Sequence, residues 1–505
     1  RELGEAAAAR LGDAVMRFGF RQATLSGLSI GVDVLRQYSR FDTHLAEAWR
    51  RAEELENQSD PGADSPSDGA VVDHWLEVAR DFERAALAEL AQDRDGLNPV
   101  HLMVVSGARG NFNQVKQLVA MRGLLASPDG KIIESPFATT FVRGQSPLEF
   151  FASTYGARKG LADTCLKTAN AGFLFKRVMS AVHDILITEQ DCGGGDGIAK
   201  SAMRGWHGED VVVPLGERVR GRTAGEDIQL SGDGTAIVRR GELISSEAAQ
   251  KIEASELEVV VVRFPLTCKA SVGVCAKCYG ADLSKWNLAR PGLPIGVIAA
   301  HSIGEPLTQL TLRIFTFRAP ERGPSGRDQG SRVVANLPHL DELFEAGRRP
   351  GREDADTRVS FEERLSQDGA AATAEYLLVE MLRIYRLQGV HIDDRHFEVI
   401  IRQMLDKLRV TAVGDTGLQV GELVSASQLE AANAALGEGE RAAAESTIVG
   451  VTDAASATED FVAAATTHGG VPALARAAAR KQSVALTGVR SCTTFGKVVP
   501  ARASD

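Results

Sequence analysis

The longest regular pattern in the chain is a helix-compatible run from Leu148 to Ala181, without a proline. As one continuous helix it is about 50 Å long, at roughly 1.5 Å per residue, which exceeds the needs of a small domain. Its glycines at 156, 160 and 172 each cost about 1 kcal/mol relative to alanine. They therefore predict close approach of a neighbour, or bending.

One face of this run is small and polar. Thr164, Lys167, Thr168 and Ala171 are spaced to lie on the same side of a helix. A face of small side chains lets a flat partner come close. Tight packing inside a core is the alternative that the spacing leaves open.

The N-terminal part of the chain reads as helical. Arg1 to Phe18 predicts a helix, followed by a turn at Gly27 and a short extended piece ending near Leu35. Two further helices, over 43–56 and 73–92, are separated by a segment rich in proline, glycine and aspartate, which predicts an exposed turn. The pair is interpreted as an antiparallel hairpin with an acidic exterior.

A basic segment follows at residues 107–126. It combines the glycine-flanked Arg109 with a predicted short helix that carries Lys116 and Arg122. Glycine lets the backbone approach a neighbour closely or adopt positive φ. Packing between domains explains such a loop as readily as a functional contact does.

Four cysteines bracket a segment of short alternating apolar runs. Residues 205–265 predict a small β-rich unit, with Cys192 before it and Cys268, Cys275 and Cys278 after it. Two thiolates two residues apart can hold adjacent corners of a tetrahedron around zinc, and the other two complete a closed structural site. A redox pair or chance clustering are the alternatives.

A second helical hairpin is predicted near residue 300. Ser302 and Glu305 have the spacing of a capping box, and in the helix that follows one face carries Gln309, Leu312, Arg313 and Thr316. A glycine- and proline-rich tip at 319–331 leads to a returning helix over 337–346. The pattern suits a lid that folds over a site, or an ordinary helical hairpin.

Composition adds two constraints. The 505 residues are 44% apolar and 25% charged, with a net charge of −10, and no run of 18 apolar residues or signal-peptide pattern is present. This predicts a cytoplasmic protein without a membrane partner. Residues 107–177 carry ten basic against four acidic side chains, so a local basic seam can still line a channel for a polyanion.

Several strings together resemble one family. SGARGNFNQVKQLVAMRGL, STYGARKGLADTCLKTANAGFL, CKASVGVCAKCYG, IGVIAAHSIGEPLTQLTLR and YRLQGVHIDDRHFEVIIRQML occur in the order seen in the C-terminal part of the beta-prime (largest) subunit of bacterial-type DNA-directed RNA polymerase. The split beta-double-prime subunit of cyanobacteria and plastids covers the same region. The resemblance spans nearly the whole chain.

The resemblance implies an α+β, multidomain fold with a long bridge helix, helical hairpins and a small zinc-clipped β-rich unit. The implied parts are an active-site-proximal segment (1–40), an acidic secondary-channel rim (41–98), a bridge-supporting loop region (99–147), the bridge helix (148–190), the zinc-bound unit (191–290), the trigger-loop hairpin (291–348), a shortened jaw or linker (349–376), and a C-terminal clamp and assembly region (377–505).

Residue roles follow from the same resemblance. The trigger-loop face that closes over the incoming nucleotide corresponds to Gln309, Leu312, Arg313 and Thr316. Thr168 and Ala169 lie where the templating base meets the active site. The remaining nucleic-acid contacts, or their supports, are Arg109, Arg158, Lys159 and Lys167.

Partners and cofactors are implied as well. They are template DNA, RNA, ribonucleoside triphosphates, the beta, alpha and omega subunits, a sigma factor and the N-terminal part of beta-prime, in the bacterial nucleoid, with structural Zn²⁺. The family's aspartate-rich Asn-Ala-Asp-Phe-Asp-Gly-Asp run, which holds the catalytic Mg²⁺, does not occur in these 505 residues. The expected nucleotidyl transfer therefore needs a further chain segment.

One departure from the family motivates a different class of function. Thr316 stands where the family's trigger loop has histidine, and threonine is neither a cation nor a useful acid near neutral pH. With the shortened jaw, this supports the alternative of a divergent, non-catalytic nucleic-acid-binding assembly scaffold.

Overall fold

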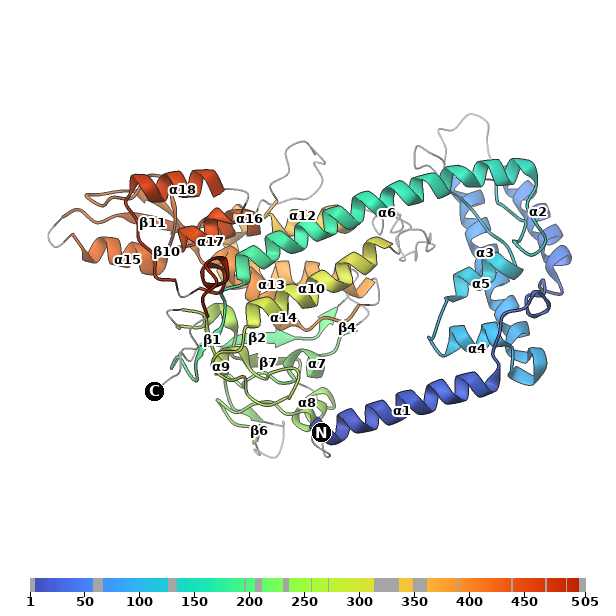
Figure 1. The fold of residues 1–505 in the computed structure, drawn as a ribbon, viewed down its shortest axis with the longest axis horizontal. Coiled ribbons are helices and arrows are strands. Elements are labelled where there is room, and N and C mark those ends of the chain that lie inside the picture. Colours follow the sequence, from blue (N-terminus) through green and yellow to red (C-terminus); the bar gives the residue numbers. More distant parts are fainter. Residues whose placement is uncertain are drawn as a thin grey trace. The chain divides into compact units, whose positions relative to one another are not determined.

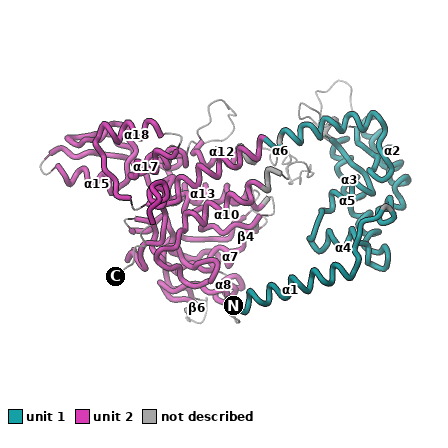
Figure 2. The backbone as a smooth tube through the Cα atoms, in the orientation of Figure 1, with its two compact units in different colours: residues 1–165, 315–319 teal, residues 166–314, 320–505 magenta. Residues whose placement is uncertain are grey.

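The structure is a computed structural model of mixed helix and sheet (Figure 1). It divides into two compact units (Figure 2), of which unit 1 contains residues 1–165 and unit 2 most of the remainder; the boundary falls within one helix, α6 (Pro147–Val182). Each unit is described separately. The described residues are 5–57, 67–125, 133, 135–194, 197–204, 211–229, 236–255, 257–270, 272–312, 336–347, 361–387, 390–436, 439–467, 470–486 and 488–498.

Unit 1 is helical in its described part. Aromatic side chains from two antiparallel helices contribute to its core: the buried Phe41 and Phe82 rings lie 5.4 Å apart, and the exposed Trp49 ring covers the buried Trp75 at 4.7 Å. Its helices are α1 (Glu5–Ser26), η1 (Val32–Val34), α2 (Phe41–Asn57), α3 (Ser67–Gln92), η2 (Asp93–Gly96), α4 (Pro99–Val105), α5 (Phe112–Val119) and the first part of α6.

Local sequence explains where α6 begins. The Ser146 amide donates to Glu149 Oε2 at 2.9 Å, and the Glu149 amide donates to Ser146 Oγ at 3.3 Å, which is a reciprocal capping box. Pro147 occupies the first helical position, where its missing N–H costs nothing. Thr139 fixes the same carboxylate by donating to Glu149 Oε1 at 3.0 Å.

Unit 2 holds the larger core, which gathers apolar side chains from the second half of α6 and from several other helices. Besides α6, the described helices of unit 2 are α7 (Leu215–Val219), α8 (Ser246–Glu253), η3 (Pro265–Thr267), α9 (Ala276–Tyr279), α10 (Ile295–Leu312), α12 (Asn336–Phe344), α13 (Phe361–Leu387), α14 (Asp394–Leu405), α15 (Ala426–Ala434), α16 (Val451–Ser456), α17 (Phe461–Ala465), α18 (Gly470–Ala479) and α19 (Val489–Thr494).

The described strands of unit 2 are short and form small sheets. Four sheets are two-stranded, pairing β1 with β8 in parallel and β2 with β7, β3 with β4 and β5 with β6 in antiparallel fashion; the fifth has the order β10-β9-β11. Their bounds are β1 (Ile187–Glu189), β2 (Ile198–Ser201), β3 (Met203–Arg204), β4 (Val211–Val213), β5 (Ile228–Gln229), β6 (Ala236–Val238), β7 (Val259–Val262), β8 (Val274–Cys275), β9 (Lys407–Ala412), β10 (Leu423–Ser425) and β11 (Ala443–Ser446).

Helix α10 packs against α6 at very short range. A Cβ added to Gly304 would lie 2.2 Å from Phe175 Cδ2, and one added to Gly296 would lie 1.8 Å from the Val182 carbonyl oxygen. Any larger residue at these two positions would push the helices apart. The glycines that allow close approach of the two helices are therefore on α10.

Four local predictions are wrong. Helix α1 continues to Ser26, and a 3₁₀ turn replaces the extended piece after it. Ser302 lies inside α10, which begins seven residues earlier, so Ser302 and Glu305 are no N-terminal capping box. Arg122 follows α5 instead of lying on it. The predicted β-rich unit also contains α7 and α8.

Other predictions have a mixed outcome. The long helix and both helices of the acidic hairpin are confirmed. Of the turn predicted over 57–69, residue 57 belongs to α2 and residues 67–69 to α3, while 58–66 lie outside the described residues, as does the hairpin tip at 319–331. Within the described part, no helix is long and apolar enough to cross a membrane.

Candidate functional site

The fold brings the four predicted cysteines together. Parallel pairing of β1 with β8 places the residues after Glu189 beside Cys275, and the single turn of α9 carries Cys278. All four Sγ atoms lie within 4.8 Å of one another, and those of Cys192 and Cys278 are 3.8 Å apart. Four sulfurs around a tetrahedral zinc ion, each at about 2.3 Å, are separated by about 3.8 Å. The cluster, formed by Cys192, Cys268, Cys275 and Cys278, therefore fits zinc.

A glycine makes this arrangement possible. Gly273 has a φ of +67°, and a Cβ there would lie 2.4 Å from the Leu186 carbonyl oxygen. Only glycine lets strand β8 pass so close to the residues before β1.

An arginine lies against the sulfurs. The Nη2 atom of Arg263 is 3.3 Å from Cys192 Sγ, 3.2 Å from Cys278 Sγ and 3.7 Å from Cys275 Sγ, while its Nη1 donates to Asp191 Oδ1 at 2.8 Å. Four thiolates around Zn²⁺ carry a net charge of −2, and a guanidinium hydrogen-bonded to three of them offsets part of that charge.

The hydrogen bonds around the cluster shift the pKa values of several of its groups. Hydrogen bonds from the Cys275 and Cys278 thiols, and from the Cys275 amide, hold the pKa of Cys268 well below its ordinary value. Partial burial opposes ionisation of Asp191, but hydrogen bonds from Lys277 and Arg263 lower its pKa to about 2. Cys268 and Asp191 thus favour their anionic forms, whereas hydrogen bonding to Cys268 raises the pKa of Cys275 to about 11 and also raises that of Cys278.

The C-terminal half of α6 is fixed to α12 by an ion pair. Arg177 donates through Nη1 to Glu345 Oε1 at 2.6 Å and through Nη2 to Asp341. Thr452 donates to the same Glu345 oxygen at 2.6 Å. The Arg177 side chain is only 14% exposed, so this contact is better shielded from solvent than a surface ion pair.

The predicted nucleic-acid residues divide by exposure. Arg109 lies in an exposed turn of unit 1; on α6, Arg158 and Ala169 are exposed, and Lys159, Lys167 and Thr168 are half-buried.

One residue of the small polar face has a different role. Ala171 is fully buried in the unit 2 core, so packing explains this end of the face.

Two of the α6 glycines have open surroundings. Gly156 and Gly172 have no atom within 4 Å of an added Cβ, so no described part of the chain requires glycine there.

The predicted lid residues are only partly described. Gln309 and Leu312 lie in the last turn of α10, and their side chains are outside the described set. Arg313 and Thr316 fall wholly outside it. Helices α10 and α12 are confirmed as helices on either side of that segment.

Comparison with known proteins assigns the chain to a family. Residues 144–324 and 350–426 match the sequence profile of RNA polymerase Rpb1, domain 5, and residues 49–155 match that of RNA polymerase Rpb1, domain 4. The chain belongs to the Rpb1 family of RNA polymerase subunits. The domain 5 match alone covers more than half of the chain, and it includes α6, α10 and all four cysteines.

Similarity to bacterial proteins supports the same family assignment. The chain is 35% identical to the DNA-directed RNA polymerase subunit beta' of Natranaerobius thermophilus, over 99% of this chain and 45% of that protein. The beta' subunits of Pelotomaculum thermopropionicum and Desulforudis audaxviator are also 35% identical, over 99% of this chain and 46% and 47% of those proteins. The chain thus spans about half the length of these relatives.

Sequence reasoning missed Arg263 and Arg177. Arg263 had a detectable signal, because it is a lone cation directly after the apolar run 259–262 and shortly before Cys268. Arg177 had none, because its two carboxylate partners are more than 160 residues away in the sequence.

Proposed function

We propose that the chain is a functional part of the largest subunit of a DNA-directed RNA polymerase, which copies DNA into RNA from ribonucleoside triphosphates. The observation that carries this proposal is its 35% identity to beta' subunits along 99% of its own length. The implied partners are template DNA, RNA, the beta, alpha and omega subunits, a sigma factor and the rest of beta-prime, and the implied location is the bacterial cytoplasm.

Helix α6 is proposed to be the bridge helix. It is a single helix of 36 residues with exposed side chains along much of its length. Gly156 and Gly172 face open space in the described chain. Glycine has a low helix propensity, so its presence at these two positions is explained by bending of the helix or by contact with a molecule outside the chain. A templating base passing beside Thr168 and Ala169 is such a molecule.

The segment from α10 to α12 is proposed to be the trigger loop. The contact between Gly304 and Phe175 ties α10 to α6, and Arg177 ties α12 to the same helix. Both α10 and α12 are thereby held against α6, and the resemblance implies that the segment between them closes over a nucleotide. Arg313 then supplies positive charge to the leaving pyrophosphate, as in-line phosphoryl transfer requires.

The cysteine cluster is proposed to hold structural zinc. All four corners of the tetrahedron are protein sulfurs, so no open coordination position exists for catalysis. The catalytic Mg²⁺ is expected to be held mainly by carboxylates outside this chain, since the aspartate-rich run is absent from its sequence.

A promoter-independent elongation assay with the assembled subunits tests the proposal. We expect measurable nucleotide addition by the native chain, and a fall of about 100-fold in its rate in Arg313→Ala, because one donor at the transferring group is lost. Thr316→His is expected to raise the rate if proton donation limits the native reaction.

The scaffold alternative gives a different result in the same assay. If subunits assemble with normal stoichiometry but native chain, Arg313→Ala and Thr316→His are all inactive, the chain is a non-catalytic scaffold. Zinc content, measured on the same preparations, confirms that each variant is folded around the cluster.

A further inference from the structure

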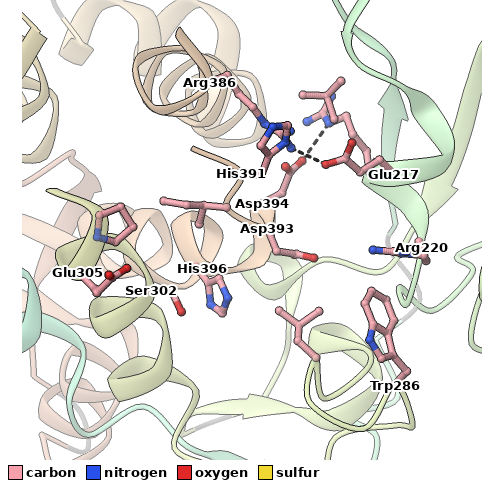
Figure 3. Close-up of a pocket in the computed structure, with 15 residues that line it drawn as sticks. Glu217, Arg220, Trp286, Ser302, Glu305, Arg386, His391, Asp393, Asp394 and His396 are labelled. Carbon is pink, nitrogen blue, oxygen red and sulfur yellow. Dashed lines mark hydrogen bonds and ion pairs between the residues drawn. The ribbon is translucent and has the colours of Figure 1, made fainter. Parts of the chain in front are cut away.

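Unit 2 contains a cavity that none of the roles above uses. Its volume is about 480 Å³, within the usual size range of small-molecule sites. Four elements form its walls: the segment 213–220, the turn 283–286, helix α10, and the segment from the end of α13 into α14 (Figure 3).

Most acidic groups of this cavity are already neutralised. Asp393 accepts from Arg395 through both carboxylate oxygens, each at 2.9 Å. Asp394 accepts from Arg218 Nε at 2.9 Å. Near Asp394, Arg386 pairs with Glu217 at 2.5 Å (Figure 3). These carboxylates therefore add little negative potential for an incoming ligand.

Arg220 is the exception among the cations of the cavity. It is exposed, and no described carboxylate forms an ion pair with it. Its guanidinium lies 4.1 Å from the centre of the Trp286 ring, toward which it points in Figure 3. A guanidinium that lies over an aromatic ring can still direct N–H groups to a carboxylate or phosphate oxygen.

The backbone holds this pair in place. Trp286 has a φ of +56°, an uncommon value for a large residue. Gly221, at a φ of +72°, leaves the room that the ring occupies, since a Cβ there would lie 3.2 Å from Trp286 Cζ3. The stacked pair is therefore built into the fold.

A buried histidine points to a ligand independently. His396 is only 5% exposed and lines the cavity, yet its Nδ1 has no hydrogen-bond partner among the described residues. Burial lowers the pKa of His396, so the ring is neutral near pH 7. A buried polar atom without a partner costs about 1–3 kcal/mol, which a ligand that bonds to it recovers.

We propose that this cavity binds a small aromatic molecule that carries one anionic group. The anion pairs with Arg220, the ring lies against the Trp286 side of the cavity, and a polar group of the ligand bonds to His396.

Two matched probes test the charge preference. 4-Hydroxyphenylacetate and tyramine share a ring and a hydroxyl group but carry opposite charges. Binding of each to the assembled polymerase that contains this chain is measured by ligand-observed NMR over a millimolar titration. We expect the anion to bind at least about tenfold more tightly than the amine, which corresponds to about 1.4 kcal/mol.

Matched variants locate the binding. Arg220→Gln is expected to abolish the preference for the anion, whereas Arg240→Gln, which changes another exposed arginine of unit 2 outside the cavity, is expected to keep it. His396→Phe is expected to weaken binding of both probes. Equal or tighter binding of tyramine to the native chain, a preference for the anion that survives Arg220→Gln, or no binding of either probe would each overturn the proposal. The readout does not depend on transcription, so its failure is separate from failure of the proposed function.

Discussion

At the scale of single residues, Arg263 shows how charge is balanced at the cysteine cluster. It contacts three of the four sulfurs, and it is held in turn by Asp191, which also pairs with Lys277 at 2.9 Å. A tetrathiolate site without this cation would concentrate more negative charge in a largely buried place. We therefore expect the arginine to favour the zinc-bound form of the site.

Replacing Arg263 tests this role. Arg263→Met keeps much of the apolar stem and removes the charge, and we expect zinc affinity to fall about 10- to 100-fold, as for other groups that support metal ligands. Competition with a chromogenic chelator measures the affinity, with Arg240→Met as the control. Equal affinities for the two variants would show that charge at position 263 does not affect the metal.

Glu375 links stability to pH. Its carboxylate accepts from Lys200 Nζ at 2.6 Å and from Arg218 Nη2 at 2.7 Å. Although burial opposes ionisation, these two cations lower the pKa of Glu375 to about 2. A carboxylate whose pKa is lowered by folding stabilises the protein above its unfolded pKa, and that contribution disappears as the pH falls through the folded pKa.

The corresponding prediction concerns Glu375→Gln. We expect it to lower the stability of unit 2 by about 2 kcal/mol at pH 6, after allowance for solvent screening, and the difference from the native chain to vanish between about pH 4.5 and pH 2. Thermal midpoints across this range measure it. Glu430→Gln, on the exposed side of α15, is the control for effects of acid that do not involve Glu375. If the thermal midpoints of both variants follow the same pH curve, the contacts of Glu375 with Lys200 and Arg218 contribute nothing to the pH dependence of stability.

At the scale of elements, the sequence predicts long helices well and short strands poorly. The run from Leu148 to Ala181 differs from α6 by one residue at each end, because helical periodicity accumulates over many turns. The strands of the segment 205–265 have two to four residues each, too few for alternation to distinguish a strand from a turn. The sequence also did not predict α7 and α8 in this segment, because helices of five and eight residues are too short for helical periodicity to be recognised.

The role of the α6 glycines can be tested at Gly172. Because an added Cβ meets no atom within 4 Å, Gly172→Ala is expected to stabilise the helix by roughly 0.5–1 kcal/mol. If the glycine serves bending or contact with template, the same change slows nucleotide addition several-fold despite the gain in stability.

Gly12→Ala is the matched control, since Gly12 lies on α1 with equally open surroundings. Hydrogen exchange measures the stability of each helix, and single-nucleotide addition kinetics measures the rate. A normal rate in Gly172→Ala would leave the glycine without a functional reason.

At the scale of the whole molecule, the described part contains separate hydrophobic cores. One lies in unit 1 and is centred on Trp75 and Phe82; the largest, in unit 2, includes three of the cluster cysteines. Burial of apolar side chains is the main stabilising contribution, so loss of the metal is expected to act first on the core that contains its ligands.

Removal of zinc tests this separation. Chelation is expected to increase hydrogen exchange in β1, β8 and α9, while α2 and α3 of unit 1 keep their protection. Exchange followed by mass spectrometry distinguishes the regions, and re-addition of Zn²⁺ serves as the control. Uniform loss of protection across both units would show that they unfold together.

The candidate site was predictable where its chemistry is local in the sequence. The spacing of Cys275 and Cys278 predicts a metal knuckle, and in the structure the sulfurs of Cys192 and Cys268 lie beside those two. Contacts between distant segments, such as Arg177 with Asp341 or Arg220 with Trp286, have no local pattern. The same holds for Gly296 and Gly304, whose necessity depends on which helix crosses them.

The cysteine cluster also sets an order of events during synthesis. Cys192 leaves the ribosome 86 residues before Cys278. At about 5–20 residues per second, the nascent chain therefore carries the first thiol for roughly 4 to 17 seconds before the last one emerges. Three of the four sulfurs appear only at the end of this interval, within eleven residues. The proposed four-sulfur zinc site therefore cannot be complete until Cys278 has emerged, and the segment between Cys192 and Cys268 is synthesised before the site can form.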